Sequence, residues 1–277
     1  MIIFPAIEDW DDAYTNGAHI AQGDGYVARW SQAAQAFRDG IGSMGSARLD
    51  LSYGPLPRNR LDIFLPRSAP RGIFVFIHGG YWMRFDKSSW SHLARGAIER
   101  GLAVAMPAYT LCPEIRIGGI VREISAAISF AAKEIDGPVF LAGHSAGGHL
   151  VSRMLAVPGP LDDNMRRRIV HVVSISGLHD LRPIMKTAMN ATLKIDWAEA
   201  RAESPCLLEP HNGTRLTCWV GAAERAEFIR QNALLANVWR GLGAETAEVV
   251  EDNRHHFNII DGLADARSAL ARALFEA

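Results

Sequence analysis

Short apolar segments alternate along most of this chain with longer segments of helical period, and this alternation constrains the fold more than any other feature. Residues 72–77 ("GIFVFI") and 138–143 ("PVFLAG") are apolar throughout, as strands buried on both faces are. Between them, residues 117–135 carry one apolar stripe at helical spacing. Strands that alternate with amphipathic helices form right-handed crossovers. The sequence therefore predicts an α/β fold with a mostly parallel, twisted sheet that has helices on both faces.

The same pattern predicts about eight strands, at residues 47–53, 59–66, 72–77, 102–109, 138–143, 169–176, 215–221 and 244–251. The first two follow each other without a helix, which predicts an antiparallel edge. Helices are expected directly after residue 145 and at residues 88–100, 117–135 and 257–275. No repeat or linker divides the chain, so residues 1–277 are predicted to form a single domain.

Two segments have no clear period. Residues 1–45 are expected to be irregular, and residues 178–209 are expected to form a small, partly helical cap. That insertion is short for the large apolar cover of a lipase, so it predicts a restricted pocket.

Composition argues against several kinds of partner. The 277 residues carry 29 Lys and Arg against 30 Asp and Glu, which gives no electrostatic reason to expect a nucleic-acid partner. The three cysteines have no paired spacing and the histidines no metal-ligand spacing, so neither a disulfide framework nor a metal is expected, and no other cofactor. The chain shows no signal-peptide pattern and no stretch of 18 apolar residues, which predicts a cytoplasmic protein without a membrane partner.

A serine lies in the turn after the strand at 138–143. "GHSAG", Gly143 to Gly147, fits the pattern G-x-S-x-G, follows an apolar strand and opens a helix. This context is typical of a nucleophile elbow, a turn so tight that only small residues fit around the serine. Ser145 is therefore the predicted nucleophile. A plain strand-to-helix turn is the alternative interpretation.

Two glycines follow the strand at 72–77, in "IHGGYW". Acyl transfer needs backbone N–H groups directed at the point where negative charge develops. The end of the third strand is the position from which an H-G-G motif supplies such a donor. We expect Gly79 or Gly80 to hold the oxyanion together with the amide of Ala146.

Four histidines are candidates for the catalytic base. His144 and His149 neighbour the serine in sequence, but we interpret both as structural. In this architecture the acid and the histidine follow the nucleophile in the chain. "RHHF", after the last strand, offers His255 and His256, and position alone does not decide between them.

The acid is expected directly after the strand at 215–221, where its carboxylate can reach across the edge of the sheet. Glu224 lies three residues past the end of that strand. Glu227 is expected to lie already on the following helix. Glu224 is therefore the favoured acid.

Taken together, "HGGYW", "YTLCPE", "GHSAGGHL", "ESP", "VGAAERAEFIRQ" and "HHFNIIDGLAD" resemble the α/β-hydrolase superfamily, and within it the kynurenine formamidase (arylformamidase) and small carboxylesterase branch. "DDAYTNGAHI" near the N-terminus is also similar to that branch. The resemblance covers nearly the whole chain, with the motifs in the same order. It implies an α/β-hydrolase fold.

The resemblance also implies roles for particular residues. In such enzymes the triad histidine directly precedes the phenylalanine of an H-F pair, which selects His256 over His255. The formamidases typically have aspartate where this chain has Glu224. The N-terminal segment of the branch is thought to fold over the site, which implies that Tyr14 and Asn16 contact the substrate.

The predicted activity is that of a serine hydrolase, which cleaves small acyl esters or aryl formamides through an acyl-enzyme intermediate. Tyr81 and Trp82, beside the expected oxyanion glycines, are predicted to bind the substrate. One alternative is a lipase-like enzyme acting at a lipid surface, against which the short cap argues. Another is a catalytically silent hydrolase fold that serves as an interaction module. Such proteins usually lose a triad member, whereas here every expected position is filled.

Overall fold

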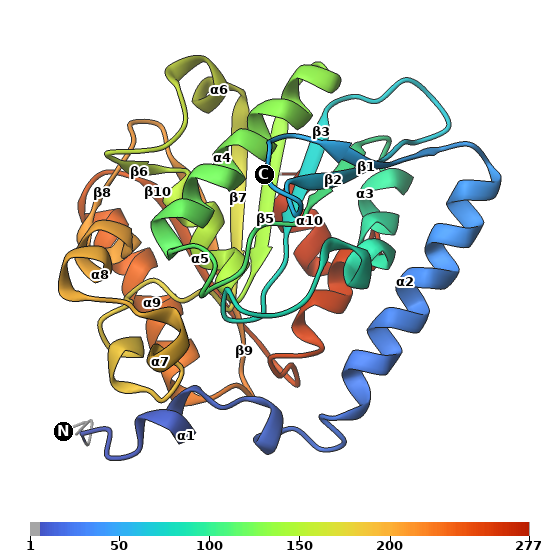
Figure 1. Cartoon of the computed structure of the whole chain (residues 1–277). Helices are drawn as coiled ribbons and strands as arrows, with labels where there is room; N and C mark the ends of the chain where they lie inside the picture. The colour runs from blue at the N-terminus through green and yellow to red at the C-terminus, as the bar shows by residue number, and fades with distance from the viewer. Residues whose placement is uncertain (1–5, 277) are drawn as a thin grey trace.

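An eight-stranded sheet runs through the centre of the molecule, with helices on both of its faces (Figure 1). The structure is a computed structural model that describes residues 6–276, so the first five residues of the segment predicted at 1–45 lie outside it. The strand order is β1-β2-β4-β3-β5-β7-β9-β10. β1 and β2 are antiparallel to their neighbours, and all other pairs are parallel. The predictions of a mostly parallel sheet of about eight strands and of an antiparallel edge are confirmed.

The strands of the sheet are β1 (Ala47–Ser52), β2 (Arg60–Phe64), β3 (Ile73–Ile77), β4 (Ala103–Pro107), β5 (Val139–His144), β7 (Ile169–Ile175), β9 (Arg215–Gly221) and β10 (Glu245–Glu251). A separate antiparallel pair joins β6 (Ala156–Val157) to β8 (Glu209–Pro210).

The α-helices are α1 (Trp10–Tyr14), α2 (Gly25–Ser43), α3 (Arg95–Glu99), α4 (Ile117–Glu134), α5 (Ala146–Arg153), α6 (Asp163–Arg168), α7 (Asn190–Leu193), α8 (Trp197–Glu203), α9 (Ala226–Gly241) and α10 (Ala269–Phe275). Short 3₁₀ segments are η1 (Gly17–His19), η2 (Lys87–Ala94), η3 (Ile184–Lys186), η4 (Pro205–Leu207) and η5 (Ile259–Ala264).

Side chains of the central strands alternate between two apolar cores, because successive residues of a strand point to opposite faces. In β3, Ile73, Val75 and Ile77 face the core under α4, α5 and α9, whereas Phe74 and Phe76 face the core under α2, α3 and α10. All five of these side chains are buried. The apolar runs of the sequence are therefore strands covered on both faces.

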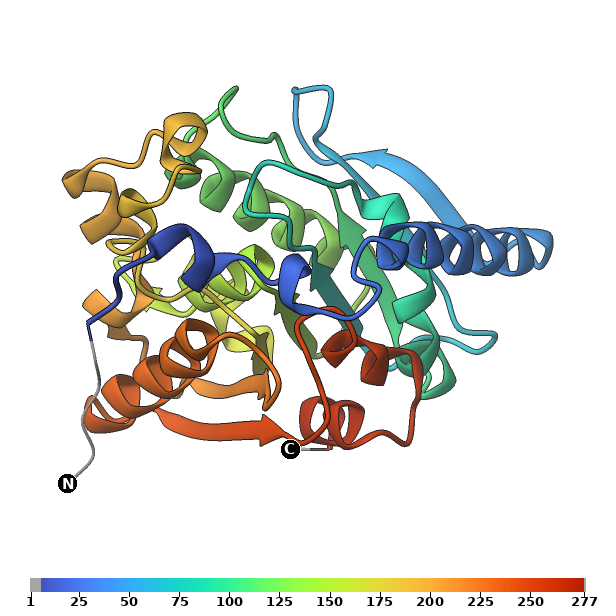
Figure 2. The same ribbon diagram turned by 90° about the horizontal axis from the view of Figure 1, so that it is seen from below.

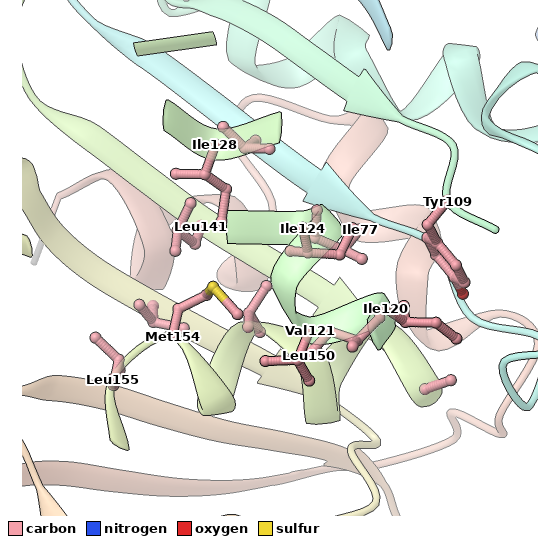
Figure 3. Close-up of a cluster of buried hydrophobic side chains, with 14 of the residues drawn as sticks. Ile77, Tyr109, Ile120, Val121, Ile124, Ile128, Leu141, Leu150, Met154 and Leu155 are labelled. Carbon is pink, nitrogen blue, oxygen red and sulfur yellow. The ribbon is translucent and has the colours of Figure 1, made fainter. Parts of the chain in front are cut away.

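Figure 3 shows part of the first core. One stripe of α4, which includes Ile120, Ile124 and Ile128, packs against the sheet and against α5. From the strands, Ile77 and Leu141 reach the same cluster. The stripe predicted for residues 117–135 is thus the buried face of α4.

The prediction that residues 1–45 are irregular is wrong, because α2 spans nineteen of them. Its fully buried side chains are only Trp30, Ala34 and Ile41, which form a narrow stripe with a weak periodic signal. Glycines within its last turn obscure the pattern further, since glycine is a poor helix former. Contacts with η2 and the sheet edge, rather than propensity, hold this helix.

The prediction of a single helix at residues 257–275 is also wrong. The chain forms η5, breaks at residues 265–268, and restarts as α10. The Ser268 hydroxyl accepts a hydrogen bond from the Ala271 N–H (2.9 Å), so this serine is the N-cap that begins the second helix. Similarly, the helix predicted at 88–100 is η2 followed by α3.

A buried ion network holds α2 against the sheet edge. Asp62 of β2 is fully buried, and its carboxylate contacts the Arg38 guanidinium of α2 at 2.6 Å and the Lys87 ammonium of η2 at 2.9 Å. Lys87 is itself 5% exposed and also contacts Asp50 at 2.8 Å. Three elements far apart in sequence are therefore joined at one carboxylate.

We expect Asp62→Ala to lower the free energy of unfolding by about 3–5 kcal/mol, because it leaves buried cationic groups without their shared partner. Urea unfolding measures the loss. Arg48→Ala removes an exposed ion pair with Glu134 and should cost at most about 1 kcal/mol. Equal, small losses in both variants would show that the Asp62 network does not anchor α2.

Candidate active site

The candidate residues lie on loops that follow β3, β5, β9 and β10. These strands are parallel, so their carboxyl ends meet at one edge of the sheet. This is the edge at which open α/β sheets generally bind ligands. Figure 2 views the molecule from below and shows the N-terminal segment, in dark blue, crossing this side.

Ser145 has a strained backbone, with φ 57° and ψ −117°, at the junction of β5 and α5. Residues other than glycine rarely adopt this conformation, and such strain is concentrated at functional sites. Its N–H donates to the Ile175 carbonyl (2.8 Å), which ties the turn to the end of β7. A Cβ added at Gly143 would lie 2.0 Å from the Gly147 carbonyl oxygen. The tight turn expected from the sequence is therefore present around the serine.

His256 and Glu224 form a buried pair. The His256 Nδ1 and the Glu224 Oε2 are 2.7 Å apart, and the two side chains are 6% and 0% exposed. The other carboxylate oxygen, Oε1, accepts hydrogen bonds from the Ser176 hydroxyl (2.6 Å) and the Gly221 N–H (2.9 Å). With Nδ1 engaged by the carboxylate, Nε2 is the nitrogen of His256 left for proton transfer.

Ser145 and His256 line one cavity. Among residues 6–276, no hydrogen bond joins the Ser145 hydroxyl to the His256 ring. Catalytic hydrogen bonds often tighten only when a substrate is bound, so this geometry is compatible with a nucleophile and its base.

The two neighbouring alternatives make other contacts. The His255 Nε2 is 3.1 Å from the Tyr26 hydroxyl of α2, and it makes no hydrogen bond to Glu224 within residues 6–276. Glu227 accepts a hydrogen bond from the Tyr14 hydroxyl (2.7 Å) and pairs with Arg230 (2.6 Å). Of the two candidate histidines and two candidate acids, the structure thus brings together His256 and Glu224.

The residues predicted to hold an oxyanion surround the serine. A Cβ at Gly79 would lie 3.0 Å from the Ser145 Cβ, and Gly80 has a φ of +110° that favours glycine. Ala146 is the first residue of α5, where the N–H has no partner within the helix and the helix dipole is positive. Among the backbone hydrogen bonds of turns and loops within residues 6–276, none has the N–H of Gly79, Gly80 or Ala146 as its donor.

The cavity beside Ser145 has a volume of about 500 Å³. Residues 10–24, here named the N-terminal strap, supply much of its lining: Asp11, Tyr14, Thr15, Asn16, Gly17, Gly23 and Asp24. A second group of lining residues is aromatic: Trp30, Phe85, Trp90 and Phe257. The segment predicted as a cap at 178–209 contributes Met189. The strap therefore covers more of the cavity than that segment does.

Hydrogen bonds from two other parts of the chain hold the strap at Tyr14. The Tyr14 hydroxyl donates to Glu227 of α9 and accepts from the Gln231 amide (2.9 Å). The Tyr81 hydroxyl, from the loop after β3, donates to the Tyr14 carbonyl. Burial raises the pKa of the Tyr14 phenol, so it stays a protonated donor at neutral pH. These contacts join the strap to α9 and to the loop after β3.

The cavity lining includes three of the residues that were predicted to contact the substrate, namely Tyr14, Asn16 and Tyr81. The prediction for Trp82 is wrong, because its side chain is fully buried and packs edge-on against His149 at 5.3 Å between ring centroids. Tyr81 and Trp82 both have left-handed φ values, 52° and 59°, which turn the chain back on itself. The indole consequently lies in the core beside α5.

Two residues of the candidate site were missed in the sequence. Trp30 lines the cavity from α2, a helix whose weak period gave no signal. Ser176 contacts Glu224 from the loop after β7, and its only signal was its place directly after a predicted strand.

His144 and His149, which neighbour Ser145 in sequence, are buried and uncharged. Burial lowers the pKa of His149 to about 3, and its Nε2 is 2.6 Å from the Glu203 carbonyl oxygen. Burial lowers the pKa of His144 well below the usual range, and its ring lies 4.5 Å from that of His256 between centroids. His144 thus forms a neutral wall of the site next to His256.

Comparison with known proteins finds a matching family model, a similar curated protein and similar solved structures. The BD-FAE family model matches residues 61–210. The kynurenine formamidase of Danio rerio is 26% identical over 244 residues, which cover 84% of this chain and 83% of that protein. A crystal structure from Silicibacter sp. TM1040, described as "a putative thioesterase", is 50% identical with a TM-score of 0.92, covering 97% of this chain and 99% of that one. A Pyrobaculum calidifontis esterase is 17% identical with a TM-score of 0.67, over 90% and 91%, which indicates a common fold.

Within residues 6–276, no helix is both long enough and apolar enough to cross a lipid bilayer.

Buried histidines make stability depend on pH. Burial lowers the pKa of His149 and His179 to about 3 and that of His78 to about 4. In the unfolded chain these rings take up protons below about pH 6.5. The unfolded state then binds more protons than the folded state, so stability present above pH 6.5 is lost as the pH falls toward 4.

We expect the free energy of unfolding to fall between pH 7 and 5.5, by about 1 kcal/mol for each such histidine. Urea titrations at both pH values measure this fall. His149→Gln keeps a donor toward the Glu203 carbonyl but does not titrate. The free energy of unfolding of this variant should therefore fall by about 1 kcal/mol less than that of the parent. Identical falls in the variant and the parent would contradict the assignment of His149 as a buried neutral group.

Proposed function

This chain belongs to the BD-FAE family and is an α/β-hydrolase of the formamidase and esterase type, and on that premise we propose that it is a serine hydrolase. The proposed substrates are small acyl esters or aryl formamides, cleaved through an acyl-enzyme intermediate. The single observation that carries the proposal is the buried pair of His256 and Glu224, 2.7 Å apart, at the cavity that Ser145 also lines.

In the proposed mechanism, His256 removes the proton from the Ser145 hydroxyl as the oxygen attacks the substrate carbonyl. The N–H groups of Gly79 or Gly80 and of Ala146 stabilise the negative charge that develops on the carbonyl oxygen. The protonated His256 then gives its proton to the leaving alcohol or amine. A water molecule hydrolyses the acyl-enzyme by the same sequence, with His256 again as the base.

Glu224 has two roles in this mechanism. Its carboxylate keeps the proton of the neutral imidazole on Nδ1, so that Nε2 can act as the base. It also stabilises the imidazolium that forms after proton transfer. The absence of solvent around this side chain strengthens both interactions.

The lining of the cavity supports a small substrate. A volume of about 500 Å³ is within the usual range for a small-molecule site. Trp30, Phe85 and Phe257 offer aromatic surface for an apolar or aryl group. The strap closes the cavity without the large apolar cover that action on a lipid surface needs, which argues against the lipase-like alternative.

The catalytically silent alternative is disfavoured because suitable residues occupy the positions expected for the nucleophile, the base and the acid. A silent hydrolase fold has no need for a strained serine, a histidine and an acid at one cavity. Backbone strain of this kind costs on the order of 1–3 kcal/mol and persists where it serves the site.

We expect Ser145→Ala and His256→Ala each to lower kcat on p-nitrophenyl acetate by several orders of magnitude. Triad members act as a unit, and loss of one costs up to about a millionfold in well-studied serine hydrolases. Glu224→Gln should cost about ten-thousandfold, because an amide cannot stabilise imidazolium and favours the wrong tautomer. Steady-state kinetics measure all three, with labelling by an active-site phosphonate as a second readout for Ser145.

The matched controls are substitutions of the histidine and the glutamate that lie near His256 and Glu224 in sequence. His255→Ala and Glu227→Gln should retain kcat within about tenfold, since neither side chain contacts the proposed catalytic groups. Substantial turnover by Ser145→Ala in a clean preparation would refute the serine mechanism. A larger loss in the controls than in the triad variants would reassign the base and the acid.

A substrate panel tests the second part of the proposal. We expect acetate and butyrate esters to be hydrolysed far faster than esters with acyl chains longer than about eight carbons, because the cavity is small. N-formylkynurenine and a short acyl thioester belong in the panel, since relatives are described as a kynurenine formamidase and as a thioesterase. Values of kcat/KM from one preparation rank the classes. Faster turnover of long-chain esters, rising above their solubility limit, would favour the lipase-like alternative instead.

A further inference from the structure

The carboxylate of Glu224 is held by more than the histidine. Ser176 is fully buried directly after β7, and its hydroxyl donates to the Glu224 Oε1 at 2.6 Å. The Gly221 N–H donates to the same oxygen at 2.9 Å. Oε2 is thereby left to face the His256 Nδ1 at 2.7 Å. The two oxygens of the carboxylate therefore have different partners: Oε1 accepts two hydrogen bonds and Oε2 faces the histidine.

The position of the Ser176 hydroxyl is rigid. Its backbone has a left-handed φ of 52°, and its N–H donates to the Trp219 carbonyl of β9 at 2.7 Å. The next residue, Gly177, is packed so closely that an added Cβ would lie 2.2 Å from the Ser174 hydroxyl. The turn therefore has little freedom to move the hydroxyl away from the acid.

A glutamate needs this support more than an aspartate would. Its side chain has one more rotatable bond, so the carboxylate can adopt more positions relative to the ring. Glu224 is also a buried carboxylate, which requires donors to replace the water that it has lost. A charge-assisted hydrogen bond from a fixed hydroxyl meets both needs.

We propose that Ser176 is a positioning residue for the catalytic acid. It fixes the rotamer of Glu224 so that Oε2 stays aligned with the His256 Nδ1, and it acts on the reaction only through that carboxylate. Ser176 is not among the residues that line the described cavity, so it does not contact the substrate. This inference rests on the proposed serine hydrolase function.

The test is the kinetics of Ser176→Ala on p-nitrophenyl acetate. The expected result is a fall in kcat of about tenfold to a hundredfold, the range of a hydrogen bond to a charged group, with KM within about twofold of the parent value. Ser176→Gly should give the same kinetics. Glycine tolerates the left-handed φ, so this variant provides the measurement if Ser176→Ala does not fold.

A double-mutant cycle separates positioning from a merely structural role. In a Glu224→Ala background, Ser176→Ala should change kcat by less than about twofold, because the group that it positions is gone. Ser125→Ala is the matched control. That serine is also buried, but its hydroxyl donates to the Pro160 carbonyl at 2.8 Å and not to the acid. It should leave kcat unchanged.

The outcomes distinguish this inference from the proposed function. An unchanged kcat in both Ser176 variants, with activity still abolished by Ser145→Ala, would overturn the positioning role alone. An equal loss in the parent and in the Glu224→Ala background would also overturn it, since Ser176 would then act through another group. Activity that survives Ser145→Ala would instead refute the serine hydrolase function itself.

Discussion

The close packing of α5 against the ends of β3 and β5 is the constraint on which the rest of the site depends. A Cβ at Gly147 would lie 2.0 Å from the Ile77 carbonyl oxygen, so the backbones of helix and strand are nearly in contact. This approach forces the strained turn at Ser145 and directs the N-terminus of α5 at the cavity. It also brings the loop with Gly79 against the serine, where a Cβ at Gly79 would lie 3.0 Å from the Ser145 Cβ. Only very small side chains permit such an arrangement, which is why the sequence there is so poor in large residues.

Much of the fold could be predicted from the sequence, because buried parallel strands produce continuous apolar runs. The position of each run then placed Ser145, Glu224 and the histidine pair at one edge of the sheet. The helix at 25–43 could not be predicted in this way, since only a narrow stripe with Trp30 at its start is buried. Local pattern carries little information where contacts with distant elements provide the stability.

The side chains of the site were harder to predict than its backbone. The burial of Trp82 follows from two successive left-handed residues, and nothing in the identities of Tyr81 and Trp82 signals that conformation. The contact between Ser176 and Glu224 joins two loops 48 residues apart. Such a contact arises only from the register of β7 beside β9, which a single sequence does not reveal.

The roof of the cavity comes from a part of the chain that precedes the sheet entirely. Residues 10–24 supply part of the cavity lining, whereas Ser145, Glu224 and His256 all come from later loops. Under the proposed function, part of the surface that selects a substrate is thus encoded apart from the proposed catalytic residues. Changes in the strap can alter which molecules fit while the reacting groups keep their geometry. Under the proposed function, diversification toward new substrates can therefore proceed by changes in the strap, while Ser145, Glu224 and His256 stay the same.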